Sequence, residues 1–276
     1  VGSEMCIRDS HKSVDKQIHI FNKNDFSYLT SIGNFGEGPE EITVMGCLAI
    51  DEAHHQLYVS DHAKQKIFSY DMDSVMVDSL YKPQVKTAMN ETLFPSEYQY
   101  INDTLSIAVL IKPTSTSTFN QFLGRWNMNT GEMIPMKYTH PDIQKKRITF
   151  AASEKAGIYV ECYTRHDLMT ICSLDGELLY NIYGPDWDGG NGNKLQSFGT
   201  VMIGNDKIFV SYCGEDYARD SFPTKILVFD LEGNYLKTLE TGYKISDCCY
   251  DSFNNRIILS LNDVVQFAYL DIDGII

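Results

Sequence analysis

The chain has 276 residues, 43% of them hydrophobic and 12% aromatic, so it is long enough to bury a substantial core. Its formal net charge of −14 argues against nucleic acid and anionic lipid as partners, because no basic cluster is large enough to override that average. No run of eighteen apolar residues occurs, which excludes a membrane-spanning helix.

The first ten residues, VGSEMCIRDS, show no targeting pattern, and the strand-like alternation of the later chain does not extend into them. The seven residues EMCIRDS resemble the translation of a transposase mosaic-end adapter used in preparing sequencing libraries. We therefore expect residues 1–10 to be a non-native scar outside the fold. The alternative is a disordered natural N-terminus. If the scar interpretation is right, the true N-terminus is missing and the chain is truncated.

Six hairpins recur along the chain and organise it. In each, a run rich in Ile, Val, Phe and Tyr leads into a tight polar turn and a second apolar run. Asp, Asn, Ser and Gly suit these turns because they hydrogen-bond their own backbone or accept positive φ. The predicted turns are Asn22–Asp25, Asp71–Ser74, Asn127–Thr130, Ser173–Gly176, Asp230–Gly233 and Asp271–Gly274.

Two further strands precede every hairpin except the first. Their apolar residues alternate with polar ones, and β-branched and aromatic residues are frequent. The predicted pairs are 47–51 with 56–61, 98–102 with 104–111, 147–152 with 157–162, 199–204 with 207–213, and 244–250 with 256–262.

Four strands that return at intervals of roughly fifty residues predict a β-propeller, whose blades need about 40–50 residues each. Six hairpins predict an all-β, six-bladed propeller that forms a single domain over residues 11–276. The first blade is incomplete, because its two leading strands are missing, and the last lacks an outer strand after Gly274. The alternative is five blades, in which the two termini complete one shared blade.

Three segments carry a family resemblance. Residues 32–42, IGNFGEGPEEI, are similar to a Gly-x-Gly-x-Gly-Pro-x-Glu-type linker, residues 48–71 to one NHL-type blade, and residues 224–263 to TolB-like repeats. The chain thus resembles the NHL-like and TolB-like six-bladed β-propellers of Bacteroidota. Because such proteins are typically exported and often lipid-anchored, the resemblance implies a cell-envelope protein, periplasmic or an outer-membrane lipoprotein. Its export signal would lie in the missing N-terminus.

Loop lengths predict which end of the propeller binds ligands. The turns between first and second strands, and between third and fourth, are short. The remaining loops are long, and they include 33–45, 81–97, 184–197 and 213–225. Because long loops on a rigid scaffold commonly carry binding sites, we expect any site on this long-loop face, near the central channel.

Three long-loop segments carry candidate ligand-binding side chains. An Arg–His pair followed by Asp can clamp a carboxylate, and aromatic residues beside charged ones can hold a sugar or a peptide. The alternative for each segment is a solvated loop whose charges are satisfied locally. The candidates are Arg165 and His166, Asp186 and Trp187, and Asp216, Tyr217 and Arg219.

The sequence nominates no catalytic residue and no metal ligand, because it lacks a nucleophile elbow, a P-loop, a dinucleotide fingerprint and zinc-type Cys/His spacing. We therefore expect no cofactor. A loose calcium site through Asp186, Asp188 and Asn191 is the alternative; the segment fails the EF-hand pattern at its sixth and twelfth positions.

These observations favour a non-enzymatic binding or scaffold propeller of the bacterial cell envelope. Its expected partner is a small molecule, a glycan, or a peptide or protein bound at the long-loop face. The alternative is a metal-dependent hydrolase or lyase of the gluconolactonase-like type, because such enzymes share this architecture. The sequence leaves the choice between binding protein and enzyme open.

Overall fold

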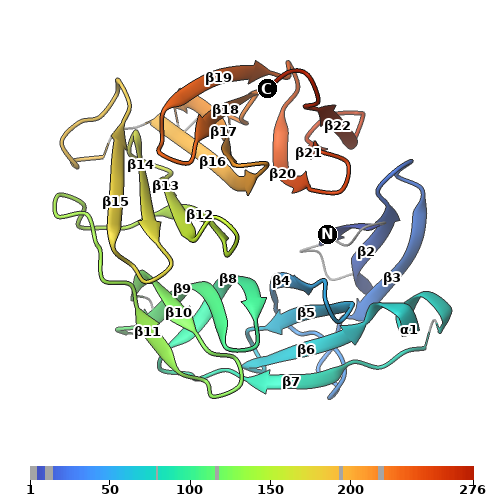
Figure 1. The fold of residues 1–276 in the computed structure, drawn as a ribbon. Helices are drawn as coiled ribbons and strands as arrows, with labels where there is room; N and C mark the ends of the chain where they lie inside the picture. Colours follow the sequence, from blue (N-terminus) through green and yellow to red (C-terminus); the bar gives the residue numbers. More distant parts are fainter. Residues whose placement is uncertain (1–4, 10–14, 79, 116–117, 193–194, 217–220) are drawn as a thin grey trace. The chain divides into compact units, whose positions relative to one another are not determined.

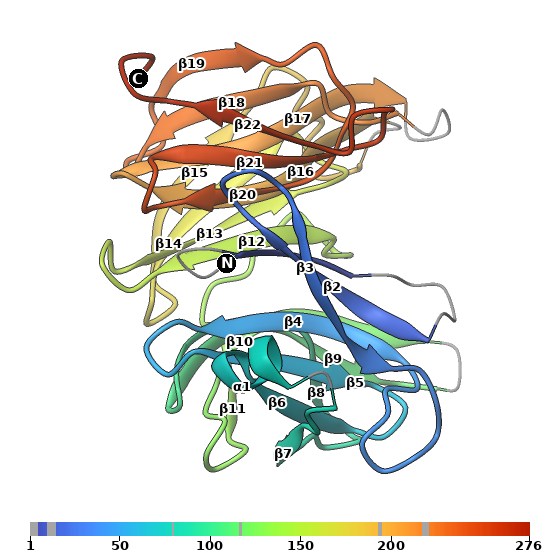
Figure 2. The same ribbon diagram turned by 90° about the vertical axis from the view of Figure 1, so that its right-hand side faces the viewer.

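The computed structural model describes residues 5–9, 15–78, 80–115, 118–192, 195–216 and 221–276. The chain forms two compact units, Val1–Pro135 and Met136–Ile276, here called unit 1 and unit 2. The described strands form six antiparallel sheets, three in each unit, and each sheet is an up-and-down meander (Figures 1 and 2).

Unit 1 contains one three-stranded and two four-stranded sheets. The first sheet consists of β1 (Met5–Asp9), β2 (Lys16–Asn22) and β3 (Tyr28–Asn34). The second consists of β4 (Met45–Asp51), β5 (Gln56–Asp61), β6 (Lys66–Asp71) and β7 (Gln84–Ala88), with helix α1 (Met72–Val77) between β6 and β7. The third consists of β8 (Phe94–Asn102), β9 (Leu105–Pro113), β10 (Phe119–Trp126) and β11 (Met133–Pro135).

Unit 2 contains two four-stranded sheets and one three-stranded sheet. The first consists of β12 (Ile148–Ser153), β13 (Ile158–Tyr163), β14 (Leu168–Ser173) and β15 (Leu178–Tyr183). The second consists of β16 (Leu195–Gly204), β17 (Lys207–Asp216), β18 (Lys225–Asp230) and β19 (Tyr235–Glu240). The third consists of β20 (Ile245–Asp251), β21 (Arg256–Leu261) and β22 (Phe267–Asp271).

The core of each unit lies between the faces of successive sheets. In unit 1, Ile18 and Ile20 of β2 pack in one cluster with Leu57 and Phe68 of the next sheet. In unit 2, side chains of β12–β14 share a cluster with those of β16–β18. Middle strands are therefore covered on both faces, and all six residues of β13 are buried. Burial on both faces explains the nearly continuous apolar runs of these strands.

Successive antiparallel meanders that pack face against face are the blades of a β-propeller. The predicted all-β propeller is thus confirmed. Several predicted turns form as expected. The Asp230 carboxylate accepts from the backbone N–H groups of Glu232 and Asn234, and Gly233 adopts a φ of +84°. The last sheet ends at β22, so it lacks a fourth strand within the described residues, as predicted.

The tight turn predicted at Asp71–Ser74 is wrong. The Asp71 carboxylate instead caps α1 by accepting from the N–H of Ser74 at 2.7 Å. Met72 and Val75, three residues apart, are both buried and anchor the helix. An Asp that bonds a backbone N–H shortly after it can begin either a turn or a helix. The fourth strand of this sheet is β7, which lies in a segment predicted to be loop.

The expectation that residues 1–10 lie outside the fold also differs from the structure. Met5–Asp9 form β1 and pair antiparallel with β2, from Met5 opposite Asn22 to Asp9 opposite Ile18. The first sheet therefore has one of the two leading strands thought to be missing. Strand pairing uses backbone groups and does not depend on where a sequence comes from, so the adapter-like origin of these residues stays a prediction.

Loop lengths follow the prediction in unit 2 and depart from it in unit 1. In unit 2, short turns such as 154–157 and 205–206 alternate along the chain with long connections such as 184–194. In unit 1, the predicted loop 81–97 is mostly β7 and the start of β8. The connection between β6 and β7, which was predicted to be a short turn, is long and contains α1.

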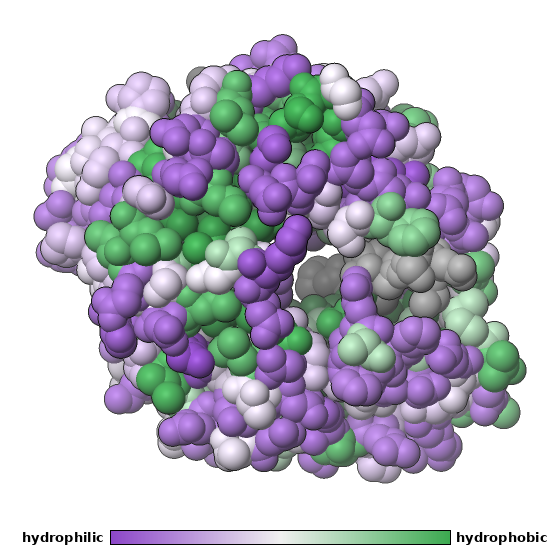
Figure 3. Space-filling model, in the orientation of Figure 1, coloured by the Kyte–Doolittle hydropathy of each residue, from purple (hydrophilic) through white to green (hydrophobic). Residues whose placement is uncertain are grey.

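The outer strands leave apolar side chains at the surface. Figure 3 shows hydrophobic residues gathered on one side of the sheet β12–β15 among largely hydrophilic surroundings. Leu178, Leu179, Tyr180 and Tyr183 of β15 are all exposed. No disulfide joins the six cysteines after residue 15, which are Cys47, Cys162, Cys172, Cys213, Cys248 and Cys249. The one helix among the described residues, α1, has six residues, whereas a membrane span needs about 20.

Candidate functional site

Three connections of unit 2, two of them long, meet around Trp187. They are residues 136–147 before β12, residues 164–167 between β13 and β14, and the segment after β15. The ring of Trp187 contacts His140 from the first connection, His166 from the second and Tyr183 from the end of β15. We call these four residues the Trp187 cluster.

The four rings pack edge to face or tilted. The Trp187 ring centroid lies 5.0 Å from that of Tyr183, 5.4 Å from that of His140 and 6.1 Å from that of His166. These distances are those of favourable aromatic pairs. The two histidines are nearly inaccessible, whereas Tyr183 is 49% exposed and Trp187 is half-buried. The cluster therefore presents Tyr183 and Trp187 to solvent on a base formed by the histidines.

His140 is held in one tautomer. Its Nδ1 accepts from the backbone N–H of Asp142 at 3.3 Å, and its Nε2 lies 3.1 Å from the Tyr183 hydroxyl. This pattern assigns the proton of the neutral ring to Nε2, which donates to Tyr183. Burial lowers the pKa of His140, so the ring is neutral at physiological pH and fixes the Tyr183 side chain.

His166 faces Asp188 across a short gap. The His166 Nδ1 and the Asp188 Oδ1 lie 3.9 Å apart, and neither atom has a hydrogen-bond partner among the described residues. Burial lowers the pKa of His166, although the Asp188 carboxylate opposes this effect. A buried polar pair that is close but unbonded leaves room for one polar atom of a ligand or a water molecule to bridge it.

Asp167 anchors the segment that carries Trp187. Its buried carboxylate accepts from the N–H of Asp186 at 3.0 Å, and its backbone oxygen accepts from the N–H of Gly184 at 2.8 Å. Burial raises the pKa of Asp167. A side chain at Gly184 would overlap the Asp167 carboxylate, so glycine is required at this close approach.

The predicted site residues are only partly brought together. His166 and Trp187 are in contact, and the backbone of Asp186 binds Asp167 beside them. Arg165 is exposed in the same loop as His166.

Of the third predicted segment, the structure describes only Asp216, which is not a member of this cluster. Asp216 ends β17 and pairs with Leu195. Tyr217 and Arg219 lie outside the described residues.

Sequence reasoning missed His140, Tyr183 and the anchoring role of Asp167. His140 lies 43 residues before Tyr183 in the chain, so no local pattern links them. The signal that could have pointed to Tyr183 is its position at the end of an outer strand, where the long segment with Trp187 begins.

The chemistry of the cluster suits binding. It offers two partly exposed aromatic rings, neutral imidazoles and nearby carboxylates. In the described part of the chain, no three His, Cys, Asp or Glu side chains gather as metal ligands would. The calcium site through Asp186, Asp188 and Asn191 stays a prediction. The Asn191 amide donates to the backbone oxygen of Asp188 at 2.9 Å, and the Asp188 carboxylate faces His166.

Comparison with protein families relates the first part of the chain to propellers. Residues 1–123 match the family model DUF5128, described as a 6-bladed beta-propeller. Comparison with curated proteins gives no match. The narrower likeness to NHL-like and TolB-like propellers stays a prediction.

Several solved structures share the fold. A member of the duf4221 family from Bacteroides vulgatus is 10% identical with a TM-score of 0.62, over 98% of this chain and 93% of that one. A protein of unknown function from Bacteroides caccae is 12% identical with a TM-score of 0.56, over 99% and 92% of the two chains. The extracellular domain of a protein described as a one component system from B. thetaiotaomicron is 13% identical with a TM-score of 0.58, over 97% of this chain and 34% of that one. At these identities the likeness shows the fold alone.

Proposed function

We propose that this protein is a non-enzymatic binding protein of the bacterial cell envelope that holds a saccharide on the long-loop surface of unit 2, at the Trp187 cluster. The observation that carries the proposal is the pair of accessible rings, Tyr183 and Trp187, whose centroids lie 5.0 Å apart on a base of buried histidines.

The polar surroundings of these rings support a sugar as the ligand. Aromatic rings with a polar neighbourhood bind molecules that have an apolar face and a polar rim. Carboxylates at Asp186 and Asp188 lie next to Trp187 in the chain, where they can accept from sugar hydroxyls. The unbonded His166–Asp188 pair adds a buried donor and acceptor near the rings. Arg165, in the same loop as His166, extends the proposed surface.

The envelope location is part of the same proposal. Its support is the similarity to the extracellular domain from B. thetaiotaomicron and to two propellers from other Bacteroides species. A lipid anchor on the full-length protein belongs to the proposal as well.

The two tryptophans allow a direct test. Trp126 is 1% exposed in the core of unit 1, so the variant Trp126→Phe leaves Trp187 as the only indole. This variant is titrated with a panel of neutral and acidic oligosaccharides while Trp187 fluorescence and binding heat are recorded. We expect at least one oligosaccharide to change the fluorescence saturably and to bind about tenfold or more weakly to Tyr183→Ala.

Tyr235→Ala is the matched control, since Tyr235 is also an exposed tyrosine on an outer strand of unit 2. Tyr235→Ala should bind the oligosaccharide as tightly as the Trp126→Phe protein does. A panel that leaves the fluorescence unchanged, or equal losses in both tyrosine variants, would refute the proposed site. Turnover of a bound oligosaccharide would refute the non-enzymatic part and favour the hydrolase or lyase alternative.

A further inference from the structure

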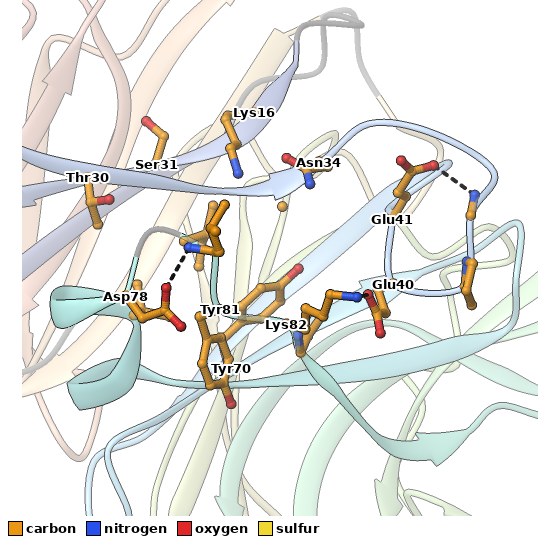
Figure 4. A pocket seen from close by; sticks show the side chains of 17 residues that line it. Lys16, Thr30, Ser31, Asn34, Glu40, Glu41, Tyr70, Asp78, Tyr81 and Lys82 are labelled. Atoms are coloured by element: carbon orange, nitrogen blue, oxygen red, sulfur yellow. Dashed lines mark hydrogen bonds and ion pairs between the residues drawn. The ribbon is translucent and has the colours of Figure 1, made fainter.

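Unit 1 contains a cavity of about 380 Å³ that lies apart from the residues nominated by the sequence. Figure 4 shows it between the β2–β3 hairpin on one side and Asp78, Tyr81 and Lys82 on the other. Its volume falls in the range of about 300–1,000 Å³ typical of ligand pockets.

One wall of the cavity is the edge of a sheet. Five consecutive residues of β3, Thr30 to Asn34, line it. The side chains of Thr30, Ser31 and Ile32 point alternately to opposite faces, so a cavity that touches all three runs along the backbone edge of the strand. Gly33, with a φ of +73°, departs from this alternation. Among the described strands, β3 is the last of its sheet and pairs only with β2. At Asn34 this edge is already occupied, because the Asn34 backbone oxygen accepts from the N–H of Ile42 at 2.8 Å. An extended segment about 10 Å long could therefore lie beside Thr30 to Ile32.

The second wall is the glycine-rich linker 33–42. Lys64 holds it in shape, because its ammonium donates to the backbone oxygens of Gly36, Gly38 and Glu41. The Glu41 carboxylate also accepts from the N–H of Gly38 at 2.8 Å. The linker is therefore held by the side chains of Lys64 and Glu41, and its residues Gly38 to Glu41 line the cavity.

The wall opposite β3 is aromatic. The ring centroids of Tyr70 and Tyr81 lie 6.4 Å apart, and the Tyr81 hydroxyl accepts from the N–H of Asp71 at 3.2 Å. Val75 of α1 adds an apolar side chain. Tyr70 is only 2% exposed and supports Tyr81, whose partly exposed ring can pack against apolar side chains of a strand laid along β3.

Charges of both signs lie along the cavity. Lys82 is paired with Glu40 at 2.8 Å at one end, whereas the Lys16 ammonium has no partner in the described part of the chain. In Figure 4, Lys16 lies on the strand side and Asp78 across from Thr30. A strand in this position would meet a cation near Asn34 and a carboxylate near Thr30.

We propose that the cavity binds an extended peptide segment of a partner protein, which adds a strand to the edge of β3. The segment carries apolar side chains at alternate positions toward Tyr81 and an acidic side chain toward Lys16. The proposal is independent of the saccharide site, because all of its residues lie in unit 1.

The test uses a displayed library of random heptapeptides selected on the immobilised full chain, with Lys16→Glu as counter-selection. Peptides that survive are synthesised, and their affinities are measured by fluorescence polarisation. We expect enriched sequences with apolar residues at every second position and an acidic residue at one end. Lys16→Glu should weaken the binding of these peptides about fivefold to tenfold, since one charge contact is reversed.

A second measurement isolates the strand pairing. N-methylation of alternate backbone amides in a selected peptide keeps its side chains but removes donors, and we expect an affinity loss of about tenfold in one of the two alternation patterns. Lys155→Glu is the matched control, because it makes the same charge change at an exposed position in unit 2. Lys155→Glu should bind the selected peptide as tightly as the unmodified chain does.

Three outcomes would overturn the proposal. The library could yield no peptide that prefers the parent chain over Lys16→Glu, or both N-methylation patterns could be harmless. Alternatively, the chain could dimerise in a manner that Lys16→Glu abolishes, which would assign the β3 edge to a second copy. Because the oligosaccharide titration uses Trp187, failure of either site leaves the other standing.

Discussion

The Lys146 ammonium donates to the Glu161 carboxylate over 2.6 Å, and the two side chains are only 8% and 1% exposed. The Tyr163 hydroxyl donates to the other oxygen of Glu161 at 3.1 Å, and the Tyr163 ring contacts His166. This buried chain of contacts joins the connection before β12 to the base of the Trp187 cluster.

Breaking this ion pair should destabilise unit 2 strongly. Lys146→Met leaves the Glu161 carboxylate buried, with the Tyr163 hydroxyl still donating to it, and we expect a loss of about 3–5 kcal/mol in unfolding free energy. Lys146→Met combined with Glu161→Gln removes both charges and should recover part of the loss. Urea denaturation of the three proteins measures both effects; equal losses in the single and double variants would contradict the interpretation.

Lys64 should control the order of the linker 33–42. Lys64→Met removes the donor that binds three backbone oxygens. We therefore expect faster hydrogen exchange across the linker and a decrease of about 2–3 kcal/mol in the free energy of unfolding. Lys66→Met is the control, because Lys66 lies two residues away and no bond of its ammonium occurs within the described chain. Unchanged exchange in Lys64→Met would show that the linker holds its shape without the ammonium.

The two buried histidines of the cluster should make the protein less stable in mild acid. Burial lowers the pKa of both His140 and His166 in the folded state, below the usual value of about 6.5. As pH falls below 6.5, the unfolded chain binds protons that the folded chain does not, so stability decreases until the folded pKa values are reached. Melting temperatures between pH 7.5 and 5 should fall.

The variant pair His140→Gln and His166→Gln tests the origin of this acid sensitivity. Removal of both imidazoles should flatten the decline between pH 6.5 and 5. NMR titration of the parent would give the two pKa values directly, and values at or above 6.5 would contradict the prediction.

Gly184 should be sensitive to a single methyl group. In Gly184→Ala the new side chain would overlap the Asp167 carboxylate. We therefore expect a decrease of about 1–3 kcal/mol in the free energy of unfolding and a shift in Trp187 fluorescence. Gly189→Ala meets no atom within 4 Å and costs only the strain of its positive φ, about 1 kcal/mol. A fluorescence shift of equal size in both variants would argue against the anchoring role of Asp167.

Local pattern was enough to predict most of the blades. Strands such as β13 and β17 were found because Ile, Val and Tyr recur there between turns built on Asp and Gly, and those turns depend on residues only a few positions apart. The pattern failed at Asp71, where the same side-chain bond begins a helix instead of a turn. It also did not predict β1, whose pairing with β2 is a contact between backbones.

The sequence by itself determined the repeating strands, the acidic surface and two members of the cluster, His166 and Trp187, because each depends on composition or on neighbours in the chain. Tertiary structure alone decided that His140 and Tyr183 complete that cluster and that β3 borders a cavity with Tyr81. These relationships join residues 43 and roughly fifty positions apart, whose proximity results from the packing of whole sheets and loops.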